Sequence, residues 1–295
     1  MCEQLRGDQM TVVRILFLAR YRIPHACVSL QFDHNLLGID YTIIASPVPK
    51  EELWEIFHNH NIDTSKFEYI PDSVVYEHYP EVNNWVLPGD YRGWWLRQQA
   101  IKLSFLDYLK IDVMLMQDPD TFLIEPYCCY QDGVLNFHAL MDTTQGSYNG
   151  VFESITGLPH QSSHCFVTEF VPVRYTDWVQ LREHLAQRWP NKHWLDAIID
   201  AVPGMPTVPP WGDGNIIKWF SEYEFVGNWA VHCGNVSFQP HLRYEYSSLD
   251  QMTAWTDQTN AVADAIPDLR FSLQIENGHV VNFDHYMNAI QERLK

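Results

Sequence analysis

Basic residues are scarce in this chain. Its 295 residues include 19 Lys and Arg against 37 Asp and Glu, which gives a formal net charge of −18. A surface this acidic argues against binding to nucleic acid or to anionic lipid, because both ligands carry negative charge themselves. An anionic ligand would therefore have to be held by a local group of basic side chains or by a metal ion.

Long hydrophobic runs and paired cysteines are also missing. The longest early apolar run, residues 12–19, is interrupted by Arg14 and is too short to cross a membrane. It is followed by Arg20 and Arg22 instead of a small-residue cleavage site, so we expect neither a membrane span nor a signal peptide. The six cysteines form no Cys-x-x-Cys pair and no zinc-ligand spacing, which predicts a reducing compartment and a cytoplasmic protein.

The sequence contains no internal repeat, low-complexity tract or Gly/Ser-rich linker that would divide it. Hydrophobic residues make up 46% of the chain and aromatic residues 14%, which excludes disorder for most of its length. We therefore expect a single folded domain that spans residues 1–295.

The first half alternates between predicted strands and helices. Buried strands are expected at residues 11–19, 39–46, 67–70 and 113–116, with helical segments between them. This alternation predicts an α/β fold of Rossmann-like character, with a mixed, mainly parallel sheet flanked by helices. In such sheets ligands bind at the carboxyl ends of the strands.

Two carboxylates follow the fourth of these strands. Asp118 and Asp120 are separated by Pro119 and stand on a short loop between two apolar segments. Carboxylate oxygens at such a position suit Mg²⁺ or Mn²⁺, which commonly bind substrate phosphates as well. The alternative is a tight turn in which Asp118 caps its own backbone and Pro119 fixes the bend.

A helix expected at residues 94–106 precedes this strand and is apolar around most of its girth, so we expect it to be buried. Gln98 and Lys102 are four residues apart and share a helix face, with Arg97 beside them. In so acidic a chain this group suggests an anion held between Lys102 and a metal ion. The alternative is a structural ion pair between Lys102 and one of the two aspartates.

Together this helix and the strand after it resemble the core of the GT-A glycosyltransferases. The resemblance covers roughly residues 11–240, and its specific part is the segment 94–126. Its motif is a Trp-x-x-Gln-Gln-x-x-Lys-Leu helix followed by a hydrophobic strand that ends in Asp-x-Asp-Thr, here Trp95, Gln98, Gln99, Lys102, Leu103, residues 114–117, Asp118, Asp120 and Thr121.

Within that superfamily the chain looks most like the small bacterial and phage enzymes with a Ser-Glu-Tyr-Glu segment in the second half, present here at residues 221–224. Pro119 departs from the Ser or Ala that many relatives have between the two acids. Proline retains both carboxylates but stiffens the loop that carries them.

The resemblance implies a site built around a divalent metal ion, Mn²⁺ or Mg²⁺. Asp120 would bind the metal directly, and Asp118 would contact either the metal or the ribose. The metal would hold the diphosphate of a nucleotide sugar, and Arg97, Gln98 and Lys102 would contribute to donor binding together with Asp118.

The implied activity is metal-dependent transfer of a sugar from a nucleotide-sugar donor, with a UDP-sugar expected, to a saccharide or another hydroxyl acceptor. Residues 11–126 would bind the nucleotide sugar, and residues 127–295, with an amphipathic C-terminal helix at 283–294, would shape the acceptor side. The alternative is a catalytically idle module on the same fold that binds nucleotide or sugar.

The second half offers three acids as candidate general bases. Asp213 lies in a turn-forming run before a helix expected at residues 216–224, where capping of the helix is its alternative role. Glu222 and Glu224 would close that helix at its negative end, where acids are unfavourable. A residue type placed against its local preference suggests function, and either acid is a candidate to deprotonate an acceptor hydroxyl.

A third metal ligand is also expected from the second half. The resemblance implies a histidine late in the chain, closely followed by glycine. His232, in a strand expected at residues 228–235, matches this pattern best, with His241 and His279 as rivals. Imidazole is an acceptable manganese ligand beside carboxylates.

Overall fold

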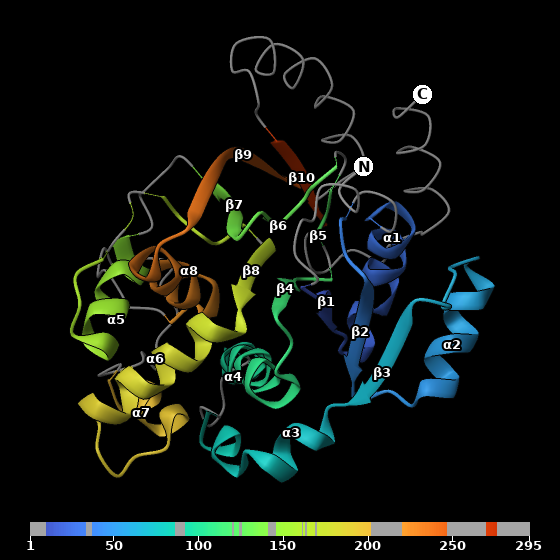
Figure 1. Cartoon of the computed structure of the whole chain (residues 1–295). Coiled ribbons are helices and arrows are strands. Elements are labelled where there is room, and N and C mark those ends of the chain that lie inside the picture. The colour runs from blue at the N-terminus through green and yellow to red at the C-terminus, as the bar shows by residue number, and fades with distance from the viewer. Residues whose placement is uncertain are drawn as a thin grey trace.

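The computed structural model of the chain describes residues 10–33, 37–85, 92–119, 121–123, 126–140, 146–160, 162, 164–168, 170–201, 220–246 and 270–275. Within these residues the strands form two five-stranded sheets, and the helices lie around the first sheet (Figure 1).

The first sheet has the strand order β3-β2-β1-β4-β8. Four of its strands are parallel to their neighbours, and β8 pairs with β4 in the antiparallel direction. The strands are β1 (Val12–Phe17), β2 (Tyr41–Ser46), β3 (Phe67–Pro71), β4 (Val113–Gln117) and β8 (Phe170–Arg174). The prediction of an α/β fold with a mainly parallel sheet is therefore confirmed.

Helices cover both faces of this sheet, because the strand residues are apolar on both sides. One hydrophobic cluster joins Leu16 and Ile44 to α1 and α2, and a larger one joins Ile15, Ile43 and Leu115 to α4 and the later helices. The helices are α1 (Ile23–Asp33), α2 (Lys50–Asn59), α3 (Ser73–His78), α4 (Arg92–Leu109), α5 (Gly146–Thr156), α6 (Tyr175–Arg188), α7 (Trp194–Ala201) and α8 (Glu222–Cys233), with 3-10 helices η2 (Arg20–Arg22) and η3 (Pro80–Trp85).

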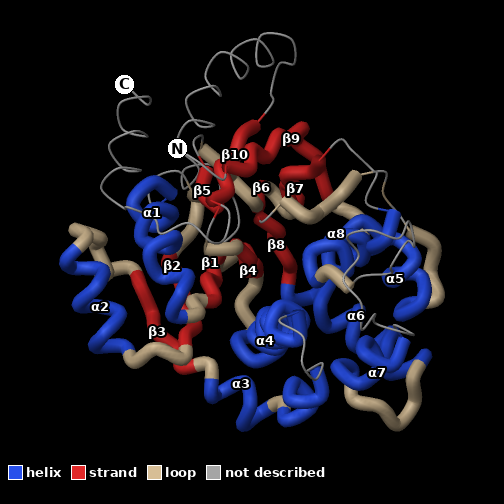
Figure 2. Tube along the Cα trace, turned by 180° about the vertical axis from the view of Figure 1, so that it is seen from behind, coloured by secondary structure: helices blue, strands red, loops and turns tan. Residues whose placement is uncertain are grey.

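The second sheet has the order β5-β10-β9-β7-β6 and mixes parallel and antiparallel pairs. Its strands are β5 (Thr121–Leu123), β6 (Tyr130–Gln131), β7 (Val134–Leu140), β9 (Val236–Tyr246) and β10 (Arg270–Ile275). Seen from behind in Figure 2, it lies at one end of the first sheet, while α5 to α8 gather at one side. Because β5 follows β4 directly, the loop of Asp118 connects the two sheets.

Helix α8 corrects the predictions for this part of the chain. Residues 228–235 were expected to form a strand, but they continue a helix that starts at Glu222 and reaches Cys233. Ser221 is the N-cap residue, and its side chain accepts a hydrogen bond from the backbone N–H of Glu224 at 3.4 Å. The two glutamates therefore lie in the first turn, at the positive end of the helix, where acids are favourable. Glu222 and Glu224 therefore agree with the local preference of a helix N-terminus, contrary to the prediction from sequence.

Some predicted elements lie outside the described residues. These are the start of the helix expected at 216–224 and the C-terminal helix expected at 283–294. In the part of the chain that the structure describes, no helix is long and apolar enough to cross a membrane.

Candidate functional site

Asp118 lies directly after β4, at the carboxyl edge of the parallel strands. The register pairs Leu16 of β1 with Gln117 of β4, so β1 and β4 end at the same level. Gln117 is buried, and its side-chain amide donates to the backbone oxygen of Thr121 at 2.7 Å, which ties together the two ends of the loop. The Asp118 side chain is 23% exposed, so it borders both the core and solvent.

A buried lysine from α4 holds this aspartate. The ammonium of Lys102, a residue that is only 5% exposed, donates to Asp118 Oδ1, to Glu222 Oε1 at 2.6 Å and to the Tyr223 hydroxyl at 2.9 Å. The Tyr223 hydroxyl in turn donates to Asp118 Oδ1 at 2.8 Å. We call Lys102, Asp118, Glu222 and Tyr223 the Lys102 cluster.

All three N–H donors of the Lys102 ammonium are used inside the Lys102 cluster. In this arrangement the lysine orients Asp118 and has no donor left for a phosphate oxygen. The structural ion pair, which the sequence left open as the alternative, is therefore the contact that the described residues make.

Burial and charge oppose each other in this cluster. Desolvation alone lowers the pKa of Lys102, but the charges of Asp118 and Glu222 and their hydrogen bonds outweigh it, so the pKa is raised and the lysine stays protonated. Desolvation raises the pKa of Glu222, which the charge of Lys102 partly offsets. The cluster places one ammonium beside two carboxyl groups, so a further cation near the partly exposed Asp118 would be attracted.

Sequence reasoning missed two members of the site. Tyr223 bridges Lys102 and Asp118, and the Gln99 side-chain oxygen accepts from the backbone N–H of Glu222 at 3.0 Å. Gln99 belongs to the Gln-Gln pair of the helix motif, so the motif did contain its signal. Tyr223 lies between the two candidate glutamates, but its spacing alone did not indicate a contact with α4.

The two glutamates point to different partners. Glu222 belongs to the Lys102 cluster, whereas Glu224 Oε1 accepts from the backbone N–H of Phe166 at 2.7 Å and Oε2 accepts from Asn228 Nδ2 at 3.1 Å. Both glutamates are 3% exposed. Glu224 thus holds a neighbouring loop against α8, and it is not brought to Asp118.

Arg97 and Lys102, two of the predicted donor-binding residues, contact different neighbours of α4. The Arg97 guanidinium donates to Asn83 Oδ1 at 2.8 Å and lies over the ring of Tyr76, 4.5 Å from its centroid. These partners belong to η3 and α3, so Arg97 faces a different neighbour from Lys102. Gln98 is partly exposed one helical turn before Lys102.

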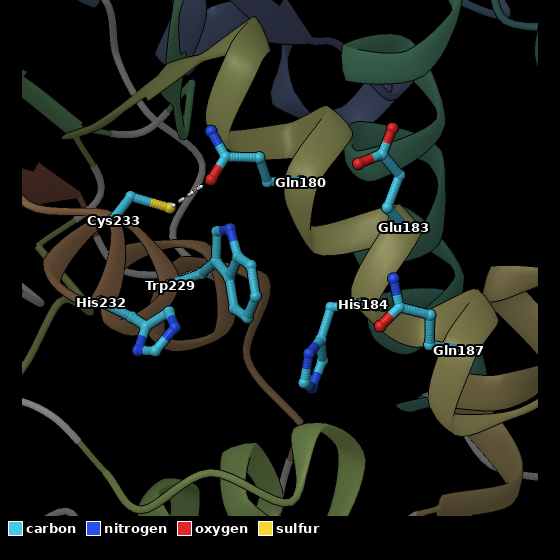
Figure 3. Close-up of a pocket in the computed structure, with 7 residues that line it drawn as sticks. All are labelled: Gln180, Glu183, His184, Gln187, Trp229, His232 and Cys233. Atoms are coloured by element: carbon cyan, nitrogen blue, oxygen red, sulfur yellow. Dashed lines mark hydrogen bonds between the residues drawn. The ribbon is translucent and has the colours of Figure 1, made fainter.

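His232 is not brought to Asp118. It is exposed in the last turn of α8, ten residues after Glu222, which corresponds to about 15 Å along the helix axis. There it lies beside Trp229, in a pocket between α6 and α8 (Figure 3). Its rival His241 lies in β9. The candidates Asp120, Asp213 and His279 lie outside the described residues.

The site offers one carboxylate that suits a hard cation such as Mg²⁺ or Mn²⁺, but not a full set of ligands among the described residues. Asp118 offers carboxylate oxygen at the solvent border, and Lys102 and Tyr223 hold its side chain in place. No group of three or more His, Cys, Asp and Glu side chains that could hold a metal ion is found among the described residues. A complete set of metal ligands therefore needs residues other than the described ones. Asp120 is the ligand that the sequence predicts.

Comparisons with known proteins match this chain to no family, but they identify solved structures with a similar fold. No family model matches the chain, and no curated protein matches it. Among solved structures, an active-site mutant of LgtC is similar with a TM-score of 0.50, at 10% identity and covering 95% of both chains. The galactosyltransferase LgtC in complex with donor and acceptor sugar analogs has a TM-score of 0.48, also at 10% identity and 95% of both chains. Apo mouse xyloside xylosyltransferase 1 has a TM-score of 0.44 at 10% identity, covering 86% of this chain and 91% of the other.

At 10% identity the likeness to the LgtC mutant concerns the fold alone. It extends over 95% of both chains. The chain therefore has the α/β fold of the GT-A glycosyltransferases, as its sequence predicted.

Proposed function

We propose that the protein is a metal-dependent glycosyltransferase that moves a sugar from a nucleotide-sugar donor, with a UDP-sugar expected, to a saccharide or other hydroxyl acceptor. The observation that carries this proposal is the Lys102 cluster. It fixes Asp118 at the carboxyl edge of the sheet, where this fold class binds ligands. The active-site mutant of LgtC, which has a similar fold, is a variant of a galactosyltransferase and supports the same class of reaction.

We assign Asp118 and Asp120 to a divalent metal ion, Mn²⁺ or Mg²⁺. When bound, such an ion neutralises charge on the leaving nucleoside diphosphate. Lys102 and Tyr223 both donate to Oδ1 of Asp118, and together they fix the direction of its carboxylate. A ligand whose orientation is fixed in this way costs less conformational entropy when the cation and donor bind.

Of the three predicted catalytic acids, we assign Glu222 to the reacting centre. It is the one that the described residues bring to Asp118, through their shared contact with Lys102. Burial makes Glu222 more basic than an exposed glutamate, which suits a group that accepts a proton from an acceptor hydroxyl. We assign the whole chain to one domain, with residues 11–126 on the donor side and 127–295 on the acceptor side.

The test is release of nucleoside diphosphate from UDP-glucose, UDP-galactose and GDP-mannose, with and without Mn²⁺, for the wild type and for Asp120→Ala and Asp118→Asn. We expect Mn²⁺-dependent release in the wild type and its loss in both variants. Asp200→Ala is the matched control, because Asp200 is a surface acid 55% exposed in an exposed ion pair. Release that persists with chelator and in Asp120→Ala would refute the metal assignment.

The alternative is an idle module that binds the donor without turning it over. It predicts that a nucleotide sugar binds in calorimetry, that Asp118→Asn weakens this binding, and that no nucleoside diphosphate appears with any acceptor tried. The two functions are therefore separated by measuring binding and release on the same samples.

A further inference from the structure

A pocket of about 400 Å³ lies between α6 and α8 (Figure 3), and its lining includes no residue of the Lys102 cluster. Helix α6 lines it with Gln180, Glu183, His184 and Gln187, whose spacing of three and four residues places them on one face. Helix α8 contributes Trp229, His232 and Cys233 with the same spacing. Its volume lies within the range of small-molecule sites, which is about 300–1,000 Å³.

Two rings of the pocket are held in place by backbone oxygens. The Trp229 indole N–H donates to the Asp177 carbonyl at 2.8 Å, and His184 Nε2 lies 2.7 Å from the Thr156 carbonyl. A carbonyl can only accept, so Nε2 of His184 carries a proton and donates this hydrogen bond. The Trp229 ring lies between two imidazoles, with centroid distances of 5.2 Å to His184 and 5.0 Å to His232. The floor of the pocket is therefore preorganised.

The lining favours a neutral, polar ligand. Within the part of the chain that the structure describes, no Lys or Arg lines this pocket, and Glu183 together with the net charge of −18 repels anions. The described residues also form no cluster of three metal-ligating side chains, and burial raises the pKa of Cys233 to about 11, so its sulfur is a thiol at neutral pH. The pocket therefore suits neither a nucleotide nor a metal ion.

The polar groups can both donate and accept. The amides of Gln180 and Gln187 do both, while the carboxylate of Glu183 accepts. Hydroxyl groups on adjacent carbons of a sugar need this mixture, because each donates one hydrogen bond and accepts others. The exposed ring of His232 adds a flat surface at the rim of the pocket.

We propose that this pocket between α6 and α8 binds one residue of a neutral saccharide, with Glu183, Gln180 and Gln187 as hydrogen-bond partners of its hydroxyls. The site is distinct from the Lys102 cluster, since Glu222 and His232 are about 15 Å apart along α8. The further assignment of this saccharide to the acceptor rests on the proposed function. The binding of a saccharide in this pocket does not depend on that function.

The test is saturation-transfer NMR of the whole protein with galactose, glucose, N-acetylglucosamine, lactose and maltotriose, in the absence of nucleotide and metal. We expect at least one of these probes to bind the wild type. The double variant Glu183→Ala/Gln187→Ala should weaken it about tenfold or more, since two hydrogen-bonding side chains are lost. Both side chains are exposed, so the fold should persist, and near-ultraviolet circular dichroism checks this.

Glu77→Ala is the matched control, because Glu77 is an exposed acid on α3, outside the pocket. It should bind the probe like the wild type, and so should Asp118→Asn. The proposal is overturned if no probe binds, if the double variant binds as tightly as the wild type, or if Asp118→Asn abolishes binding. A protein that binds saccharide here but releases no nucleoside diphosphate would contradict the proposed function and leave this site intact.

Discussion

Lys102 Nζ and Glu222 Oε1 lie 2.6 Å apart, although the two residues are 120 positions apart in the chain. Their side chains are only 6% and 4% exposed, so water hardly screens the pair. The contact joins the middle of α4 to the first turn of α8, and the same ammonium reaches Asp118 at the edge of the sheet. One buried charge thus connects three parts of the proposed site.

Lys102→Met should strongly destabilise the protein. The variant leaves Glu222 buried without its cation and Asp118 without its main partner. Removing one member of a buried ion pair costs about 3–5 kcal/mol, because the remaining charge is desolvated and uncompensated. Urea unfolding of both proteins measures the loss.

Lys192→Met is the matched control for this experiment. Lys192 pairs with Asp200 at 2.6 Å, but the two side chains are 39% and 55% exposed. An exposed pair is worth about 0–1 kcal/mol, so the control should unfold almost like the wild type. The double variant Lys102→Met/Glu222→Gln should recover part of the loss, since it also removes the uncompensated carboxylate. Equal stability of Lys102→Met and Lys192→Met would contradict the role of the cluster.

The sequence predicted the first half of the fold well, because its signals are local. The apolar runs before Ser46 and before Asp118 are short, are bounded by turn residues and alternate with amphipathic helices, which permits few arrangements other than a parallel sheet. The same local reasoning found Asp118 and Lys102, whose spacing belongs to one helix–strand unit.

The errors came from α8 and from contacts across the chain. Val226, Trp229 and Val231 favour a strand by propensity, but Ser221 followed three residues later by Glu224 is the signature of a helix N-terminus, and the helix buries these side chains against its neighbours. No local spacing indicates that this helix starts beside Lys102. The contacts of Glu222 and Tyr223, and the separation of His232 from Asp118, follow only from tertiary packing.

Gly227→Ala should destabilise α8, although alanine is the better helix former. A Cβ at Gly227 would lie 2.4 Å from Cγ of the fully buried Phe166, close to the base of that side chain. Overpacking of this kind costs about 1–3 kcal/mol. Because three ring atoms of Phe166 would lie within 2.8 Å of the new Cβ, we expect the upper part of that range, which exceeds a helix-propensity gain of about 1 kcal/mol. Thermal unfolding measures the sign.

Phe166→Leu should reduce the cost of Gly227→Ala when the two changes are combined, because the smaller side chain leaves room for the methyl group. The glycine control is Gly133→Ala, where no atom lies within 4 Å of the new Cβ and only the backbone φ of +82° is unfavourable. If Gly227→Ala stabilises the protein, the packing of α8 against Phe166 is described incorrectly.

Cys27 should make stability depend on pH in alkaline solution. Its thiol is buried in α1, and burial raises its pKa from the ordinary value of 9.0 to about 12. The folded state therefore holds this proton more tightly than the unfolded state. The resulting stability is fully present below pH 9.0 and is lost as the pH rises through the folded pKa.

The comparison that isolates this effect is wild type against Cys27→Ala. Loss of the buried sulfur gives a cost that does not depend on pH, whereas the proton-linked part falls by up to about 1.4 kcal/mol for each pH unit above 9.0. The difference in unfolding free energy between the two proteins should therefore shrink as the pH rises. A difference that stays constant would show that the thiol titrates normally.

Tyr223→Phe should weaken metal binding in the proposed reaction while preserving the fold. The change removes only the hydroxyl that donates to Asp118 at 2.8 Å and accepts from Lys102 at 2.9 Å, and the buried ring remains. Loss of a group that orients a metal ligand costs about 10–100-fold in metal affinity, so the Mn²⁺ concentration for half-maximal nucleotide release should rise by that factor. Tyr41→Phe, at the opposite end of the strands from Asp118, should leave it unchanged. If Tyr223→Phe lowers unfolding stability without moving the Mn²⁺ requirement, the hydroxyl supports only the packing of α8 against α4. Asp118 would then not be positioned for a cation by this cluster.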